Sequence, residues 1–159
     1  MSSTEISPMT LKDIREVKKI EVENNLSHWS EADYANEIER IDSIALVAKT
    51  SKRVIGFFVA RLIMKVANKA DVDNFQGEIE IYNLAVEKQF RRKGIGRKLL
   101  SECFKRGKLG QIGRIWLEVR ESNFGAIEFY KTHGFEVIYR RKNFYHTPIE
   151  DALVLSLEL

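Results

Sequence analysis

The sequence predicts one mixed α/β domain over residues 1–159, and three observations support that fold class. Strand-like runs are followed by a strand–helix–strand–helix succession and then by strand-like runs again, an order typical of a mixed sheet flanked by helices. The chain is 44% hydrophobic and 31% charged, which is ordinary for a globular protein with a single core. Only Pro8 and Pro148 interrupt it, both near its ends, so we expect no linker that would divide the chain.

The first part of the chain predicts two helices. Thr10 and Asp13 form a helix start, and apolar residues follow them on one broad side. Ser30 with Asp33 indicates a second, shorter helix. The apolar positions are Leu11, Ile14, Val17 and Ile20 in the first helix and Tyr34 and Ile38 in the second.

The remaining elements are predicted from apolar runs bounded by turn residues. The expected order is strands at Ile44–Lys49 and Val54–Met64, a long polar loop at Lys65–Gly77, a strand at Glu78–Val86, a helix from Lys98 to about Gly107, a strand at Arg114–Arg120, a helix at Asn123–Thr132, and strands at Phe135–Arg141 and Asp151–Glu158. Gly134 is the expected stop of the last helix.

A basic segment with two glycines joins the strand that ends at Val86 to the next helix. Its residues are Arg91, Arg92, Lys93, Gly94, Ile95, Gly96 and Arg97. Glycine lets the backbone turn sharply and brings its N–H groups close to a ligand. The start of the helix adds unpaired N–H groups and the positive end of the helix dipole. The segment is therefore predicted to bind an anion, and its basic side chains favour phosphate.

Composition limits the other classes of function. The net charge of +3 permits an acidic or ribosome-associated partner without predicting one. The single cysteine, Cys103, excludes an internal disulfide, and it shares a helical stripe with apolar residues, which favours a buried structural role. Three scattered histidines make a metal site improbable. The N-terminal residues lack a signal-peptide pattern and no apolar run reaches membrane-spanning length, so we expect a cytoplasmic protein that binds neither membrane nor nucleic acid.

The motifs resemble those of the GCN5-related N-acetyltransferase (GNAT) superfamily. Arg91-x-x-Gly94-x-Gly96 matches its acetyl-CoA loop, and Asn123-x-x-Ala126, Tyr130 and Gly134-Phe135 match its second half. Within the superfamily the chain is most similar to the ribosomal-protein-alanine N-acetyltransferases (RimI-like). Those enzymes share the run from Trp116 to Asn123, the aromatic loop Asn143-Phe144-Tyr145 and the following Glu150-Asp151-Ala152.

The resemblance implies a GNAT fold and acetyl-CoA as cosubstrate, with no metal. That fold has a mixed sheet of about seven strands, in which parallel strands 4 and 5 splay apart, and about four flanking helices. The acetyl-pantetheine arm is expected between the splayed strands, here at Leu84–Val86 and Trp116–Val119. The implied cofactor contacts are Leu84, Ala85, Val86, the segment Arg91–Arg97, Asn123, Ala126 and Tyr130.

The resemblance also implies the catalytic groups. Glu118 is the general base that it implies, working through water. Glu80 is kept as the alternative base because of its own position on the neighbouring strand. Tyr130 is the expected acid at the cofactor sulfur, mainly as a hydrogen-bond donor, and a backbone N–H near Val86 is the expected oxyanion donor. Neutralising an α-amine at pH 7 costs about 1 kcal/mol, whereas a lysine costs roughly 4 to 5 kcal/mol, which favours an α-amine acceptor for so modest a base.

On the acceptor side, the resemblance points to Trp29, Glu80, Tyr82 and Tyr145. Trp29 matches a Trp-Ser-Glu segment, although His28 stands where the family has proline, and Phe144 replaces the first member of a Tyr-Tyr pair. The expected acceptor is a protein N-terminus, with a ribosomal protein as one candidate, and the expected state is a monomer or weak homodimer. The Lys65–Gly77 loop is longer than in typical bacterial members.

Simpler interpretations of the same residues stay open. Glu118 could be a solvent-facing strand residue, Tyr130 part of the core, Asn123 only a helix cap and the basic segment a solvated surface. Three other functions also stay open: acetylation of a lysine side chain, acetylation of a polyamine or other small amine, and a non-catalytic CoA-sensing or ribosome-binding module.

Overall fold

The computed structural model describes residues 3–26, 28–64 and 77–159. The elements in chain order are β1 (Glu5–Pro8), a 3₁₀ turn (Leu11–Asp13), α1 (Ile14–Glu23), α2 (Glu31–Glu39), β2 (Ser43–Thr50), β3 (Arg53–Ile63), β4 (Gly77–Val86), a 3₁₀ turn (Lys88–Phe90), α3 (Ile95–Leu109), β5 (Ile112–Arg120), α4 (Phe124–Thr132), β6 (Glu136–His146) and β7 (Ile149–Glu158). The predicted mixed α/β class is confirmed.

The strands form one sheet in the order β1-β2-β3-β4-β5-β7-β6. Every neighbouring pair is antiparallel except β4 and β5, which are parallel and are joined through α3. The expected seven strands, with a parallel pair at the fourth and fifth, are confirmed. The residue pattern alone did not predict β1, because four residues are too few to show a period.

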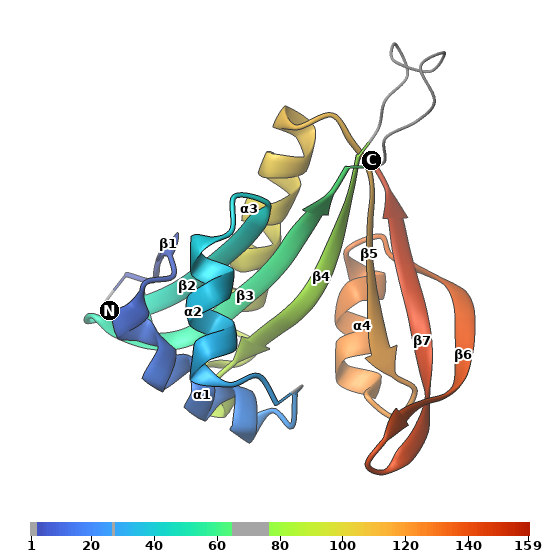
Figure 1. The fold of residues 1–159 in the computed structure, drawn as a ribbon, viewed down its shortest axis with the longest axis horizontal. Helices are drawn as coiled ribbons and strands as arrows, with labels where there is room; N and C mark the ends of the chain where they lie inside the picture. Colours follow the sequence, from blue (N-terminus) through green and yellow to red (C-terminus); the bar gives the residue numbers. More distant parts are fainter. Residues whose placement is uncertain (1–2, 27, 65–76) are drawn as a thin grey trace.

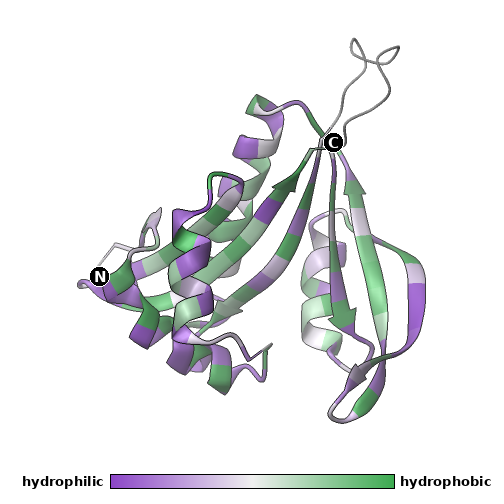
Figure 2. Ribbon diagram, viewed as in Figure 1, coloured by the Kyte–Doolittle hydropathy of each residue, from purple (hydrophilic) through white to green (hydrophobic). Residues whose placement is uncertain are grey.

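Helices cover the two faces of the sheet unequally (Figure 1). α3 and α4 pack on one face, where a large apolar cluster joins them to strands β2, β3, β4, β5 and β7. α1 and α2 pack on the other face, where a second cluster involves β2, β3 and β4. Figure 2 shows hydrophobic residues recurring along the strands and hydrophilic ones along the outer sides of α1 and α2. On that second face, neither cluster places a helix over β5.

The parallel strands separate halfway along their length, as Figure 1 shows. Their pairing runs from Gly77↔Ile112 to Ile81↔Leu117 and stops there. On its other edge β4 stays paired with β3, where an irregularity lets Val59 face Asn83 and Ala60 face Ile81, so that Tyr82 is the extra residue of a bulge. The opening begins at Tyr82 and Glu118. The expectation that Trp116 and Leu117 also border it was wrong, because they are paired with Glu80 and Ile81.

Three predicted boundaries were wrong. The helix after the glycine segment begins at Ile95 rather than Lys98, so it includes Gly96. Residues 143–145, expected in a loop, belong to β6, where the pairing with β7 is irregular between Arg141 and Tyr145 and Asn143 has a φ of 51°. Of the expected loop Lys65–Gly77, Gly77 begins β4, and residues 65–76 lie outside the described residues.

Candidate active site

The glycine segment forms a turn that leads directly into α3. Gly94 is the N-cap of this 15-residue helix and has a φ of 79°, in the left-handed region that favours glycine. No side chain caps the helix, and its first turn contains no acidic residue. The N–H groups of the first turn are therefore open to an anion, at the positive end of the helix dipole. This is the geometry that the sequence predicted for a phosphate.

Gly96 has a different role from Gly94. It lies within the first turn of α3, where a Cβ would lie 3.3 Å from a ring carbon of Phe129 in α4. Its missing side chain lets α4 pack against the start of α3. Beside it, Ile95 is buried in the core.

The basic side chains of the segment do not all face the same way. Arg91 donates from Nε to the carbonyl of Val86 (3.2 Å) and from Nη2 to Oδ1 of Asn24 (2.7 Å), which ties the turn to β4 and to the end of α1. The ammonium of Lys93 lies 5.3 Å from the ring centre of Phe90. Arg92, Lys93 and Arg97 are exposed, so they remain able to contact an anion at the turn.

The end of β4 presents an open edge beside this turn. Leu84, Ala85 and Val86 pair with β3 on one side and have no β5 partner on the other. Backbone groups along such an edge can accept an extended chain as an added strand. Leu84 and Val86 pack toward the α3 side of the sheet, whereas Ala85 packs toward α1. The edge leads directly to the glycine turn.

α4 holds the predicted tyrosine beneath the opening. Tyr130 is 5% exposed, and its ring makes edge contacts with Phe129 and Phe135, both at 5.2 Å between ring centres. Burial raises the pKa of its hydroxyl, with a further contribution from Cys103. The group therefore keeps its proton and is suited to donate a hydrogen bond.

Asn123 caps α4 with its side chain. Its Oδ1 accepts a hydrogen bond from the N–H of Ala126 at 3.2 Å, and Ala126 packs on the edge of the core. The structure shows the capping role that the sequence left open for Asn123.

Glu118 projects from β5 on the face opposite α3 and α4. Ile115, Leu117 and Val119 are buried in the core below, and Glu118 is only partly buried, as strand alternation predicts. Its Oε1 lies 3.0 Å from Nη1 of Arg141 in β6. Burial raises the pKa of this carboxyl, while Arg141 lowers it and Glu80 raises it further. A carboxyl with a raised pKa at the mouth of the opening is suited to proton transfer.

Glu80 and Tyr82 share that face on β4. The Tyr82 hydroxyl donates to Oε2 of Glu80 at 2.9 Å, and burial, followed by this hydrogen bond, raises the pKa of Tyr82. The ring of Trp29 lies 5.9 Å from that of Tyr82. Glu118, Glu80, Tyr82 and Trp29 are thus brought to one side of the opening.

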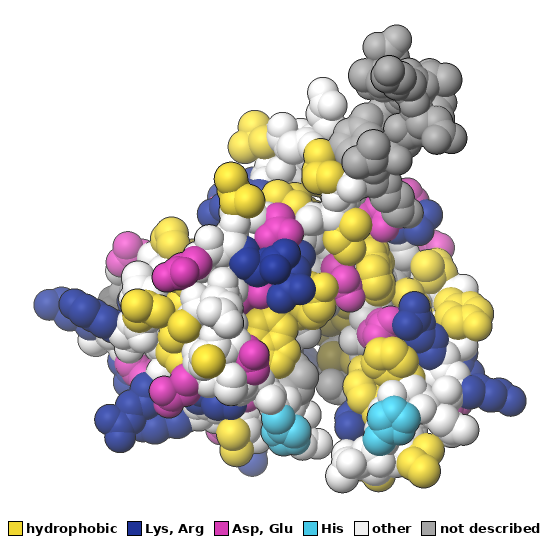
Figure 3. Space-filling view, viewed as in Figure 1, with side chains coloured by type: hydrophobic (Ala, Val, Ile, Leu, Met, Phe, Trp, Pro, Cys, Tyr) yellow, Lys and Arg dark blue, Asp and Glu magenta, His cyan; other side chains and the backbone are white. Residues whose placement is uncertain are grey.

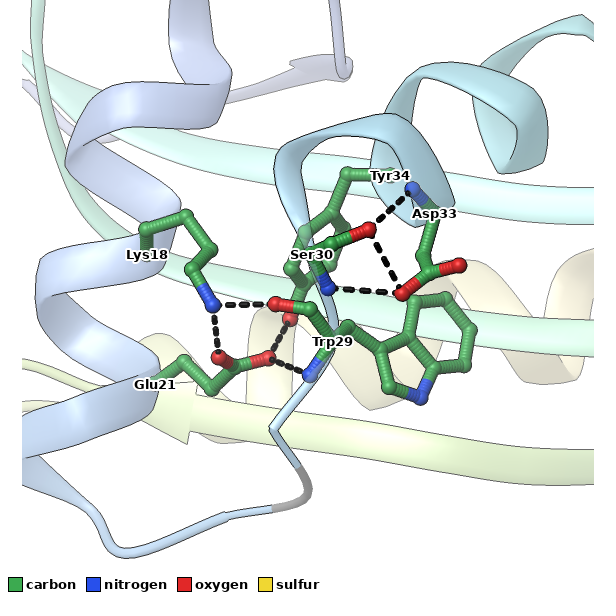
Figure 4. Close-up of polar contacts among 6 residues, drawn as sticks. All are labelled: Lys18, Glu21, Trp29, Ser30, Asp33 and Tyr34. Carbon is green, nitrogen blue, oxygen red and sulfur yellow. Dashed lines mark hydrogen bonds and ion pairs between the residues drawn. The ribbon is translucent and has the colours of Figure 1, made fainter.

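Trp29 is held by the buried carboxylate of Glu21, as Figure 4 shows. Glu21 is fully buried in α1 and accepts hydrogen bonds from Nζ of Lys18 (2.7 Å), the backbone N–H of Trp29 (3.4 Å) and the hydroxyl of Tyr34. Nζ of Lys18 also donates to the carbonyl of Trp29. Ser30 follows and caps α2 by accepting from the N–H of Asp33 at 3.0 Å. These contacts hold Trp29 and Ser30 at the edge of the site.

Tyr145 reaches the site from β6. The guanidinium of Arg120 lies 4.1 Å from its ring centre, and the Phe144 ring packs edge-on at 5.1 Å. Burial raises the pKa of Tyr145, and the charge of Glu118 raises it further. The predicted acceptor residues Trp29, Glu80, Tyr82 and Tyr145 therefore border one region, which also contains Glu118.

Sequence reasoning missed two arginines of this region. Arg61 in β3 binds the buried Glu37 through two nitrogens and lies 4.8 Å from the ring centre of Tyr82. A charged residue in the apolar strand 53–63 was the available signal for Arg61. No signal identified Arg141 as the partner of Glu118, because the contact joins two strands that are not neighbours in the sheet.

A furrow separates the two halves of this face in Figure 3, with acidic and basic side chains on both sides of it. On the α2 side lies an open pocket of about 430 Å³, lined by Trp29, Asp33, Asn36, Glu37, Arg40 and Arg61. In the described part of the chain, no three His, Cys, Asp or Glu side chains are grouped as a metal site would need. Among the same residues no helix has the length and hydrophobicity of a membrane span.

Comparison with known proteins agrees with this architecture. The model of the acetyltransferase (GNAT) family matches residues 14–135. The ribosomal protein bS18-alanine N-acetyltransferase of Salmonella typhimurium is 29% identical over 157 residues, covering 97% of each chain. The crystal structure of the ribosomal-protein-S18-alanine N-acetyltransferase from Escherichia coli is 26% identical, with a TM-score of 0.78 over 98% of this chain and 94% of that one. Arabidopsis thaliana NAA60, crystallised with acetyl-CoA, has a TM-score of 0.86 at 20% identity over 99% of both chains.

Proposed function

The chain belongs to the acetyltransferase (GNAT) family, and we propose that it transfers an acetyl group from acetyl-CoA to the α-amine at the N-terminus of a protein. The observation that carries the proposal is the opening between β4 and β5, which begins at Tyr82 and Glu118. Its β4 edge leads to an uncapped helix start, and its two faces carry Tyr130 and Glu118. Such a gap lets a donor and an acceptor approach the same point from opposite sides.

The residues present fit acetyl-CoA. The first-turn N–H groups of α3 and the exposed Arg92, Lys93 and Arg97 are suited to its pyrophosphate. The open edge at Leu84–Val86 offers backbone groups to the extended pantetheine arm. Ala126 is small enough to let that arm lie close to α4. When bound, acetyl-CoA supplies a thioester whose carbonyl is open to attack by an amine, and a thiolate as the leaving group.

The proposed chemistry assigns one role to each catalytic group. Glu118 takes a proton from the incoming amine, directly or through one water, and Glu80 stands beside it as the alternative base. Tyr130, held neutral by burial, donates a hydrogen bond to the sulfur as the carbon–sulfur bond breaks. A backbone N–H at the end of β4, near Val86, stabilises the developing oxyanion. The carbon–nitrogen bond would form as the carbon–sulfur bond breaks; the neutral amine would give one proton to Glu118, and the departing thiolate would take up one proton from solvent.

The acceptor proposal rests on the relatives and on the acceptor face. The Salmonella relative is named a ribosomal protein bS18-alanine N-acetyltransferase, and it matches this chain over nearly its full length. Trp29, Tyr82 and Tyr145 form an aromatic border around Glu118, which suits a peptide end more than a small polar molecule. We therefore propose a protein N-terminus beginning with a small residue as acceptor, in the cytoplasm, with a ribosomal protein as the first candidate.

The direct test compares acceptors of different chemistry. Short peptides that begin with Ala or Ser should release CoA thiol and gain one acetyl group at the α-amine by mass spectrometry. Lysine peptides with blocked N-termini and free polyamines should react far more slowly. Acetylation of only these last substrates would reject the α-amine assignment. Thiol release would be absent for every acceptor if the protein only sensed CoA.

Two variants test the proposed mechanism. Glu118→Gln should bind acetyl-CoA with unchanged affinity, because Glu118 lies on the acceptor face. Tyr130→Phe should still bind acetyl-CoA, because the hydrogen bond that it removes strengthens mainly as the carbon–sulfur bond breaks. Each should lower kcat by about 10²-fold or more, the usual contribution of a positioned acid or base. Unchanged turnover in both variants would refute the assigned roles.

A further inference from the structure

The ion pair between Glu118 and Arg141 limits the proposed base in the free protein. Oε1 of Glu118 lies 3.0 Å from Nη1 of Arg141, and no other cation is paired with Glu118 among the described residues. The side chain of Glu118 is 16% exposed and that of Arg141 is 47% exposed. A carboxylate that keeps such a partner is a weaker proton acceptor. The acceptor therefore has to approach a base that is already paired with Arg141.

Arg141 is less committed than Arg61 and Arg120, two other arginines of this face. Arg61 binds Glu37 through two nitrogens. Arg120 donates to Glu150 (3.1 Å) and to the carbonyls of Thr147 and Pro148. Arg141 has one ion pair and a contact with the Phe144 ring, 5.5 Å from its centre. Its other N–H groups have no hydrogen-bond partner among residues 3–26, 28–64 and 77–159, which leaves them open to a second anion.

The backbone around Arg141 supports movement of its side chain without movement of β6. The irregular stretch 141–145 is anchored by Asp151, whose carboxylate accepts from the N–H of Asn143 at 2.9 Å and from Arg140 at 3.2 Å. Neither contact involves the Arg141 guanidinium. That group lies on a half-exposed side chain, where ion pairs exchange readily.

We propose that Arg141 selects acceptors with an acidic side chain at their second position, which takes the guanidinium from Glu118 and frees the base. This inference rests on the proposed function, because it places the α-amine beside Glu118. Consecutive Cα atoms are about 3.8 Å apart, so a second-position carboxylate lies within one side-chain length of that amine. It can therefore reach a guanidinium that already touches Glu118.

The charges around Glu118 give the direction of the effect. Burial and the neighbouring Glu80 raise the pKa of Glu118, and Arg141 lowers it. Tyr145, the other titrating group that interacts with Glu118, stays neutral because burial raises its pKa. Withdrawal of Arg141 leaves only the raising influences. The acceptor's own carboxylate thereby makes the base that deprotonates it stronger.

The test compares peptides that differ only at the second residue, with the N-terminal Ala kept and Glu, Gln or Lys following it. The wild type should use the Glu peptide with kcat/KM about two- to fivefold above that of the Gln peptide, the range of a half-exposed charge pair, and the Lys peptide should be the poorest. The preference should weaken at high salt. In Arg141→Gln it should vanish while the Gln peptide is still acetylated.

Arg140→Gln is the matched control. Arg140 is the adjacent arginine of β6 with similar side-chain exposure (50%), but it pairs with Glu121 and Asp151. This variant should keep the preference for the Glu peptide. The pH profile adds a readout that a structural role would not change: the acidic limb of kcat should lie at higher pH with the Glu peptide than with the Gln peptide, and this difference should disappear in Arg141→Gln.

The outcomes separate this inference from the proposed function. Equal use of the Glu and Gln peptides by a wild type that acetylates both would overturn the role of Arg141 and leave the α-amine activity standing. A preference lost in Arg61→Gln but kept in Arg141→Gln would also overturn it. Absence of acetylation with every peptide would count against the proposed function itself.

Discussion

Replacing Gly94 by alanine should destabilise the protein through the backbone alone. Gly94 has a φ of 79°, and a Cβ built on it meets no atom within 4 Å. An added methyl group therefore neither clashes nor packs, and only the left-handed conformation contributes. That conformation costs an L-residue roughly 1 to 2 kcal/mol. Alanine also lowers the entropy of the unfolded chain, and at a left-handed site the penalty exceeds the usual gain.

We expect Gly94→Ala to lower the free energy of unfolding by about 1 kcal/mol, which corresponds to roughly 2 to 4 °C in Tm for a chain of this size. Urea denaturation followed by circular dichroism measures the first quantity and a thermal scan the second. Gly125→Ala is the matched control, because Gly125 lies in α4 with open space around it and no positive φ. That substitution should stabilise the helix by about 0.5 to 1 kcal/mol.

The opposite signs of the two substitutions are the decisive result. If Gly94→Ala were as stable as the wild type while Gly125→Ala gained stability, the turn before α3 would not need a left-handed residue. Acetyl-CoA titration by calorimetry then tests the function of the turn. Gly94→Ala should bind acetyl-CoA more weakly, because relief of the strain moves the N–H groups that open α3, and Gly125→Ala should bind it as the wild type does.

Three further predictions concern single side chains. Because burial and Glu80 raise the pKa of Glu118, the rate with the Gln peptide should fall as the pH drops through a value above the ordinary glutamate pKa. An acidic limb at the ordinary glutamate pKa would contradict this. Glu21→Gln should lower the free energy of unfolding by about 1 to 3 kcal/mol, because the Glu21 carboxylate is a buried hydrogen-bond acceptor. Because that carboxylate also holds Trp29, the same variant should raise KM for the peptide with little change in acetyl-CoA affinity. An unchanged KM would refute the role of Trp29 in peptide binding. Burial raises the pKa of Cys103 to about 12, so a thiol reagent at pH 8 should label it only after denaturant is added.

Local signals predicted the elements that depend on neighbouring residues. The strand alternation that placed Glu118 opposite Leu117 and Val119 is confirmed by their burial, and the start of α3 lies within the predicted anion-binding segment. The two glycines were given one role, whereas the structure separates them: Gly94 supplies the left-handed turn and Gly96 the close approach of Phe129. Only the tertiary packing of α4 distinguishes the two.

The contact between Glu118 and Arg141 could not be predicted from the sequence, for a physical reason. The partner of Glu118 depends on the register of β6 against β7, and that register is irregular between Val137 and Tyr139, before Arg141, and again between Arg141 and Tyr145. An irregular pairing changes the side of the sheet to which each following residue points. A regular strand pattern therefore could not place Arg141, and the aromatic residues after it were expected in a loop.

The opening in the sheet explains why the proposed acid and base come from opposite faces. Alternation along β5 sends Leu117 and Val119 toward α4 and Glu118 away from it, so a closed sheet would keep Glu118 and Tyr130 on separate surfaces. Where β4 and β5 part, one carbon placed in the gap can be approached by an amine from the Glu118 face while its leaving sulfur faces Tyr130. Substitutions on the α1 and α2 face should therefore change acceptor parameters and leave acetyl-CoA affinity intact. Substitutions at the start of α3 should weaken acetyl-CoA binding and leave the acceptor parameters intact. If substitutions at either place changed both quantities, the two substrates would not meet through this gap.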